Sequence, residues 1–175
     1  EDLYRITLEY LEDAKSHNVH YSEFFWNPTG TAELSGIPFE KAQQAIHAAT
    51  AEAQKKFDIM SRLIPSIDRE APPEKALTMV RQMIDHQHPH TIGIGIDYRE
   101  PDGPPQDFSE AYQLARDAGY HVTAHAGQFG MPAGNVQIAL DNLGVSRIDH
   151  GYTILDDPQL TRRCADAGTV FTVVP

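Results

Sequence analysis

Hydrophobic positions along the chain follow two alternating periods, one helical and one extended. Residues 2–16 carry apolar side chains on one helical face, and segment 38–53 repeats the pattern with a proline in its first turn. Gly119, Gly144 and Gly168 stand where three later helices are expected to end. The predicted helices cover residues 2–16, 38–53, 73–84, 108–118, 136–143 and 158–167.

Short apolar runs between these helices predict buried strands. Pro65 weakens the prediction for one of them, since proline gives no backbone N–H to a sheet. Segments 26–30 and 97–106 are rich in turn-forming residues and are predicted to be loops. The predicted strands cover residues 19–25, 59–67, 91–96, 120–124, 145–148 and 169–174.

Strands that alternate with helices predict a parallel sheet covered by helices. Two architectures fit this pattern, an open doubly wound sheet and a closed eight-stranded (β/α)8 barrel. Four of the apolar runs carry a polar residue at their expected carboxyl ends: Glu23, Asp97, His125 and His150. A barrel brings such ends together in one mouth, so the pattern favours the barrel. Structural roles stay open for each: a salt bridge for Glu23, a loop cap for Asp97, and structural hydrogen bonds for the histidines.

Composition and charge restrict the class of protein. Of 175 residues, 41% are hydrophobic and 22% charged, which is typical of a single globular domain. The net charge of −11 argues against a nucleic-acid partner, and no apolar run approaches the length of a membrane helix. With one cysteine, Cys164, and no leader pattern in the first residues, we expect a cytoplasmic protein without disulfides. The histidines at 86, 88 and 90 are predicted to lie in a solvated loop rather than at a metal site.

His125 is the strongest candidate for a metal ligand. It ends a predicted strand, and His150 ends the next strand along the chain. Gly127 and Gly151 follow these histidines closely, and glycine lets a metal, water or substrate approach the backbone.

The two histidine segments resemble a known family. Thr-Ala-His-Ala-Gly-Gln-Phe-Gly at 123–130 and Arg-Ile-Asp-His-Gly-Tyr at 147–152 look like the two central motifs of the adenosine deaminase family, with histidines 25 residues apart. Segments 21–28, 94–97 and 169–175 are similar to the family's second, fourth and seventh strands. The resemblance therefore spans nearly the whole chain.

The resemblance implies a zinc-containing (β/α)8 barrel that replaces an exocyclic amine on a purine-type ring with oxygen. His125 would be a zinc ligand, and His150 would act beside the metal-bound water as a base or electrostatic partner. The family's remaining ligands, a His-x-His pair in the first strand and an aspartate in the eighth, have no counterpart here. We therefore expect residues 1–175 to form a single metal-dependent hydrolase domain covering strands two to seven, with one zinc per complete chain.

Two residues depart from the family pattern. Gln128 stands where the family has a glutamic acid that protonates the ring, and an amide cannot give up that proton. With Gln128 at this catalytic position, either the substrate differs, another group supplies the proton, or the activity is weak. Alternatively, Gln128 only tunes hydrogen bonding. Glu100 stands where the family has a glycine that touches the purine, so we expect Glu100 and Gly127 to line the substrate pocket.

These features favour a zinc-dependent hydrolase acting on C–N bonds in cyclic amidines. Its expected substrate is a small molecule, adenosine or a related aminopurine, and its product is ammonia. One alternative is a metal-dependent hydrolase of the same barrel acting on a different ring amine or an amide. Another is a catalytically silent relative that binds a nucleoside. The oligomeric state is left open by the sequence.

Overall fold

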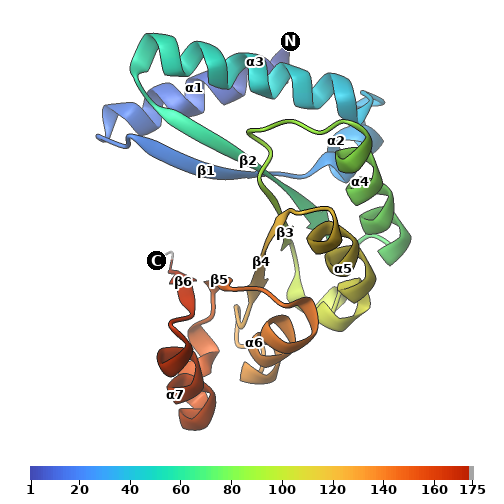
Figure 1. Ribbon diagram of the computed structural model, residues 1–175, viewed down its shortest axis with the longest axis vertical. Helices are drawn as coiled ribbons and strands as arrows, with labels where there is room; N and C mark the ends of the chain where they lie inside the picture. Colours follow the sequence, from blue (N-terminus) through green and yellow to red (C-terminus); the bar gives the residue numbers. More distant parts are fainter. Residues whose placement is uncertain (174–175) are drawn as a thin grey trace.

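Six strands form one parallel sheet in the order in which they occur along the chain. The computed structural model describes residues 1–173. A doubly wound sheet reverses its strand order at one point, whereas this sheet advances in one direction and curls (Figure 1). The prediction of a partial (β/α)8 barrel is thus confirmed. The strands are Tyr21–Trp26 (β1), Met60–Asp68 (β2), Gly93–Asp97 (β3), His121–Ala126 (β4), Arg147–His150 (β5) and Val170–Thr172 (β6).

The helices lie outside the curled sheet (Figure 1). They are Asp2–Ser16 (α1), Pro28–Ser35 (α2), Phe39–Phe57 (α3), Pro73–Asp85 (α4), Ser109–Asp117 (α5), Ala133–Ile138 (α6) and Pro158–Ala167 (α7). Shorter turns cover Glu100–Asp102 (η1), Pro105–Phe108 (η2), Ala139–Leu143 (η3) and Tyr152–Asp156 (η4). None of the helices among the described residues is both long and apolar enough to span a membrane.

Most predicted elements are confirmed within a few residues, with one clear error. Segment 26–30 was expected to be a loop, but α2 begins at Pro28. The side-chain oxygen of Asn27 accepts the N–H of Gly30 at 2.7 Å, so this residue caps a helix instead of starting a turn. The final predicted strand is observed over Val170–Thr172, and position 174 lies outside the described residues.

Pro65 lies inside β2, where the pairing with the neighbouring strand shifts. Leu63 lies opposite Thr91, but Ser66 lies opposite Gly95. The β3 side therefore uses one more residue than the β2 side, as in a β-bulge. A proline is tolerated in this interior strand because the regular ladder is interrupted there.

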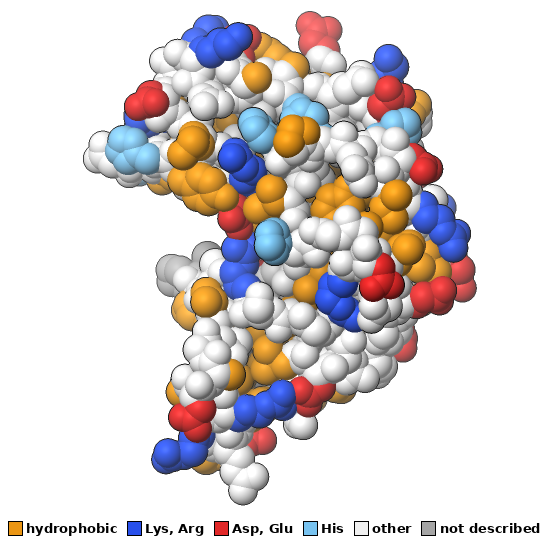
Figure 2. Space-filling model, in the orientation of Figure 1, with side chains coloured by type: hydrophobic (Ala, Val, Ile, Leu, Met, Phe, Trp, Pro, Cys, Tyr) orange, Lys and Arg blue, Asp and Glu red, His pale blue; other side chains and the backbone are white. Residues whose placement is uncertain are grey.

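The two faces of the sheet differ in chemistry. Side chains alternate between faces along each strand. Leu63, Ile94, Ile96, Ala124 and Ile148 are fully buried in the core that the helices cover. The alternate residues face the hollow of the curled sheet, which Figure 2 shows as an indentation with basic and acidic groups at its back. A cavity of about 340 Å³ on this inner face is lined by Tyr21, Glu23, Phe25, Arg147, Asp149 and Thr172.

Candidate active site

The two predicted histidines come together at the carboxyl ends of β4 and β5. The ring centroids of His125 and His150 are 4.8 Å apart, with the rings nearly perpendicular. The His125 ring also makes a T-shaped contact with the Phe25 ring, with centroids 5.2 Å apart. Gly95 makes room for this aromatic contact, because a Cβ there would lie 2.7 Å from the Phe25 ring. The expected convergence of His125 and His150 is therefore observed.

His125 has the protonation state that a metal ligand needs. Burial above all, with the neighbouring His150 and Arg69 acting in the same direction, lowers its pKa to about 4. The imidazole is therefore neutral near pH 7, with a lone pair available. Its Nε2 lies 3.8 Å from Asp149 Oδ2, beyond hydrogen-bond distance.

His150 is held in a strained backbone conformation. Its φ angle is +73°, and Gly151 follows with a φ of +70°. Any side chain at Gly151 would lie 2.4 Å from the Phe171 ring, so the glycine is also required for packing. Burial lowers the pKa of His150, and its Nδ1 is buried with no hydrogen-bond partner among the described residues. This nitrogen is thus a buried polar atom whose hydrogen-bonding capacity is unused among the described residues.

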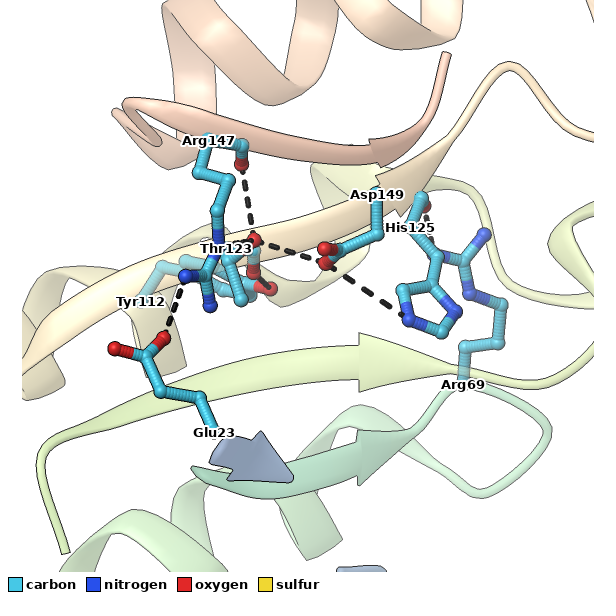
Figure 3. A network of polar contacts seen from close by, with 7 residues as sticks. All are labelled: Glu23, Arg69, Tyr112, Thr123, His125, Arg147 and Asp149. Carbon is cyan, nitrogen blue, oxygen red and sulfur yellow. Dashed lines mark hydrogen bonds and ion pairs between the residues drawn. The ribbon is translucent and has the colours of Figure 1, made fainter. Parts of the chain in front are cut away.

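A polar network supports His125 on the inner face (Figure 3). Asp149 lies opposite His125 in the β4–β5 pairing, and its Oδ2 accepts a hydrogen bond from Thr123 Oγ1 at 2.9 Å. The Tyr112 hydroxyl donates to the Thr123 carbonyl at 2.7 Å. Arg69 donates from Nη2 to the His125 carbonyl at 2.6 Å. Sequence reasoning missed these supporting residues, although alternation along 147–150 would have placed Asp149 on the face that carries His125.

Glu23 does not join the mouth with the histidines, so that prediction is wrong. Strand β1 continues to Trp26, which leaves Glu23 in the middle of the inner face. Its Oε2 forms an ion pair with Arg147 Nη1 at 2.5 Å, on the far side of Thr123 from His125 in Figure 3. The alternative interpretation of Glu23 as a salt-bridge partner is confirmed.

Asp97 does end its strand at the mouth. It lies opposite Asp68 at the end of β2, and the Asn27 side chain donates to it at 3.5 Å. Burial raises the pKa of Asp97 to about 6, and the neighbouring charge of Asp68 acts in the same direction. No backbone N–H among the described residues bonds to its carboxylate, so the expected loop cap is not observed.

The loop after β4 places the other predicted site residues. Gln128 is half-buried, and its backbone N–H donates to Glu100 Oε2 at 3.0 Å. The Gly127 N–H donates to Glu100 Oε1 at 2.9 Å. A Cβ on Gly127 would come within 2.7 Å of both Thr153 and Val136, and its φ is +71°, so packing and backbone conformation both require a glycine here.

Glu100 has a different role from the predicted one. It is 3% exposed, and both carboxylate oxygens accept hydrogen bonds from the loop after β4 or from Asn135. With three hydrogen bonds already accepted and almost no exposed surface, this carboxylate is turned toward the loop and away from the mouth. The geometry therefore makes Glu100 a support of the loop rather than a lining residue of the substrate pocket.

Residues 86–90 form a loop as predicted, but His88 and His90 in it are half-buried rather than solvated. The ring of His88 stacks on that of His47 on α3, with centroids 3.5 Å apart, and His90 meets His88 edge-on. Only His86 of the three loop histidines is exposed. Within residues 1–173, no group of three or more His, Cys, Asp or Glu side chains is arranged to hold a metal ion.

Comparisons with known proteins agree with this geometry. A model of the adenosine deaminase family matches residues 1–175. The adenine deaminase of Cupriavidus necator is 36% identical over 175 residues, which are 100% of this chain and 49% of the relative. The chain thus spans about half the length of the curated relatives it matches.

Two solved structures are also similar. An amidohydrolase from Burkholderia ambifaria, crystallised with bound Zn, shares 56% identity and a TM-score of 0.98, covering 99% of this chain and 48% of that one. The adenine deaminase from Arthrobacter aurescens shares 31% identity and a TM-score of 0.93, covering 98% of this chain and 52% of that one.

Proposed function

This chain belongs to the adenosine deaminase family, and we propose that the protein carrying it is a zinc-dependent deaminase of aminopurines. The reaction is hydrolytic: water replaces the exocyclic amine of the ring, and ammonia leaves. The observation that carries the proposal is the pairing of a neutral, half-buried His125 with His150 at 4.8 Å, at the carboxyl ends of neighbouring strands.

The residues present fit part of a zinc site. His125 offers a neutral imidazole whose Nε2 lies 3.8 Å from Asp149, too far for a hydrogen bond, and the Burkholderia relative was crystallised with zinc. Catalytic zinc takes about three protein ligands, so we expect the others from parts of the protein outside residues 1–175. Zinc, when bound, supplies hydroxide near neutral pH by lowering the pKa of water from about 15.7 to about 7.

The other residues of the mouth handle the ring and the proton. His150 accepts a proton from the attacking water or stabilises the charge that develops, since its ring faces His125. Gln128 donates a hydrogen bond to a ring nitrogen through its side-chain amide. Gly127 lets the ring approach the loop after β4. These three roles are proposals carried over from the family motifs to the matching positions.

We propose adenine, adenosine or a closely related aminopurine as the substrate. Curated relatives at 36% and 37% identity are adenine deaminases, which favours a small purine ring. Gln128 favours the second candidate, a hydrolase of a different ring amine, because an amide cannot protonate the ring. Cytoplasmic location and the single-domain assignment of residues 1–175 stay predictions.

The test uses the whole protein, purified with its metal content measured. We expect close to one zinc per chain and release of ammonia from at least one aminopurine among adenine, adenosine and their analogues. His150→Asn is expected to lower kcat by about 10²-fold or more, while the zinc content stays the same. A zinc-loaded protein that releases ammonia only from pterins or pyrimidines would favour the second candidate. Release from no ring amine would overturn deamination.

Gln128→Glu separates the remaining possibilities. If the proposed reaction proceeds with weak proton donation, restoring the carboxylic acid raises kcat by about 10²-fold. If the parent protein is inactive with metal bound and the variant stays inactive, the missing acid is not the cause, which favours the catalytically silent alternative.

A further inference from the structure

Two buried charged residues support the loop after β4 from beneath. Arg69 follows β2 and is only 1% exposed, and Glu100 follows β3 and is 3% exposed. Neither belongs to the histidine motifs. Both reach across from neighbouring strand ends to segment 125–128, which carries the proposed zinc ligand and Gln128.

Arg69 holds the backbone of the proposed ligand itself. Its Nη2 donates to the His125 carbonyl at 2.6 Å, and Figure 3 shows the guanidinium beside this peptide group. Gly103 permits the arrangement, because a Cβ there would lie 2.1 Å from the Arg69 carbonyl oxygen. The turn that carries Glu100 is therefore packed directly against Arg69.

Glu100 holds the next two residues of the same loop. One carboxylate oxygen accepts the Gly127 N–H at 2.9 Å and the Asn135 amide at 2.8 Å, and the other accepts the Gln128 N–H at 3.0 Å. Hydrogen bonds to a carboxylate are stronger than neutral ones. Two charged side chains thus hold segment 125–128 in addition to the sheet pairing of His125 and Ala126 with β5.

Folding alone gives a weak reason for this arrangement. Burying two charges carries a desolvation cost, and apolar replacements of similar volume are often as stable. Arg69 also keeps Nε and Nη1 without hydrogen-bond partners among the described residues. The burial lowers the pKa of Arg69, against the opposing effect of Glu100. Such a costly pair beneath the mouth indicates that the loop must be held in one geometry.

We propose that Arg69 and Glu100 are positioning residues: Arg69 fixes His125 for metal binding, and Glu100 fixes Gln128 for contact with the substrate ring. The inference rests on the proposed function. Neither residue touches the substrate. Each acts through the backbone of segment 125–128, so its loss changes the placement of a functional side chain without removing that side chain.

Glu100→Gln tests the proposed role of Glu100 in the whole, zinc-loaded protein. An amide has one oxygen instead of two acceptors, so the Gly127 or Gln128 N–H loses its partner. We expect kcat to fall by about 10²-fold with little change in zinc content. Hydrogen exchange at these two amides should quicken by about tenfold or more. Glu100→Asp keeps the charge and should restore part of kcat.

Glu70→Gln is the matched control. Glu70 is an exposed carboxylate after the same strand as Arg69 and accepts one backbone N–H, from Arg99 at 3.2 Å. Kcat, zinc content and exchange at segment 125–128 should equal those of the parent. A Glu100→Gln protein whose kcat and amide exchange also match the parent would overturn the role of Glu100.

Arg69→Lys and Arg69→Met test the proposed role of Arg69. The measured quantity is the affinity for zinc, determined by competition with a chelator. Residues that orient metal ligands typically change affinity by about 10- to 100-fold, and we expect this loss for the methionine variant and a smaller one for lysine. Circular dichroism and the folded fraction are measured in parallel. Zinc affinity that falls only in proportion to the folded fraction would contradict positioning by Arg69.

The two proposals fail in different ways. If the parent protein binds zinc but deaminates no aminopurine, the proposed function fails, while zinc affinity and amide exchange still decide whether Arg69 and Glu100 position the loop. If the parent deaminates but the variants behave like the Glu70 control, only the positioning inference fails.

Discussion

Acidification should destabilise the fold through one buried histidine, His47. This side chain of α3 is buried beside β3, with Nε2 2.8 Å from Thr91 Oγ1 and Nδ1 without a partner among the described residues. Burial lowers its pKa to about 3, and the nearby His88 and His90 act in the same direction. The folded protein therefore keeps this imidazole neutral across the whole range from pH 7 to pH 4.

The magnitude follows from proton linkage. In the unfolded chain His47 takes up a proton below its ordinary pKa of 6.5, while the folded chain does not do so until about pH 3. Stability from this group is complete above pH 6.5 and is lost as the pH falls toward 3. Each pH unit in this window costs about 1.4 kcal/mol, so His47 lowers the unfolding free energy by about 2 kcal/mol at pH 5.

The assay is urea unfolding of the whole protein at pH 7, 6 and 5, for the parent and for His47→Gln. The variant loses packing at every pH but no longer gains a proton on unfolding. The parent's advantage over it should therefore shrink by about 2 kcal/mol from pH 7 to pH 5. Taking the difference removes effects common to both proteins, including acid release of a metal.

His17→Gln is the control, because it removes an exposed imidazole at the end of α1. Its unfolding free energy should follow the parent's at every pH. If the difference between the parent and His47→Gln is the same at pH 7 and pH 5, burial does not keep His47 neutral, and the reasoning is refuted.

Three further predictions address packing, backbone and metal. Tyr112→Phe removes a buried hydroxyl that donates to Thr123, and should lower the unfolding free energy by about 1–2 kcal/mol at pH 7; an unchanged value would mean that this bond is replaced on mutation. Gly151→Ala adds a side chain at a φ of +70° against Phe171, and should cost at least about 1–3 kcal/mol in the same assay, whereas a neutral effect would show that the loop moves freely. Chelation of zinc from the whole protein should abolish ammonia release and lower the Tm, and added zinc should restore both; deamination by a metal-free protein would contradict the proposed function.

The sequence predicted the layers of the fold because its two hydrophobic periods alternate regularly. Helix ends with a strong cap were placed well, as at α7, where Asp157 accepts the N–H groups of Gln159 and Leu160. The failure at α2 has a local cause. Asn27 and Pro28 are typical of turns and also of helix starts, and only the contact of Asn27 with Gly30 decides between the two.

The site could be predicted where it follows from strand neighbours, and not where it depends on loops. His125 and His150 end adjacent strands, so parallel pairing alone brings them together. Glu23 was misplaced because it was treated as a strand-end residue, although the predicted strand ran on to residue 25 and β1 runs on to Trp26. The contacts of Arg69 and Glu100 depend on how two loops fold beneath a third, and no periodic pattern encodes such a fold.

Backbone strain at the mouth gives an independent reason to treat it as a functional surface. Tyr98, Phe129 and His150 have φ angles of +67°, +52° and +73°, and they follow or end β3, β4 and β5 in turn. A side chain in this conformation costs about 1 kcal/mol or more, and glycine would avoid the cost. Phe129 is 79% exposed, so packing does not compensate for its strain. Three strained residues at three consecutive strand ends are difficult to explain by stability, and these ends belong to the edge of the sheet that carries the two histidines.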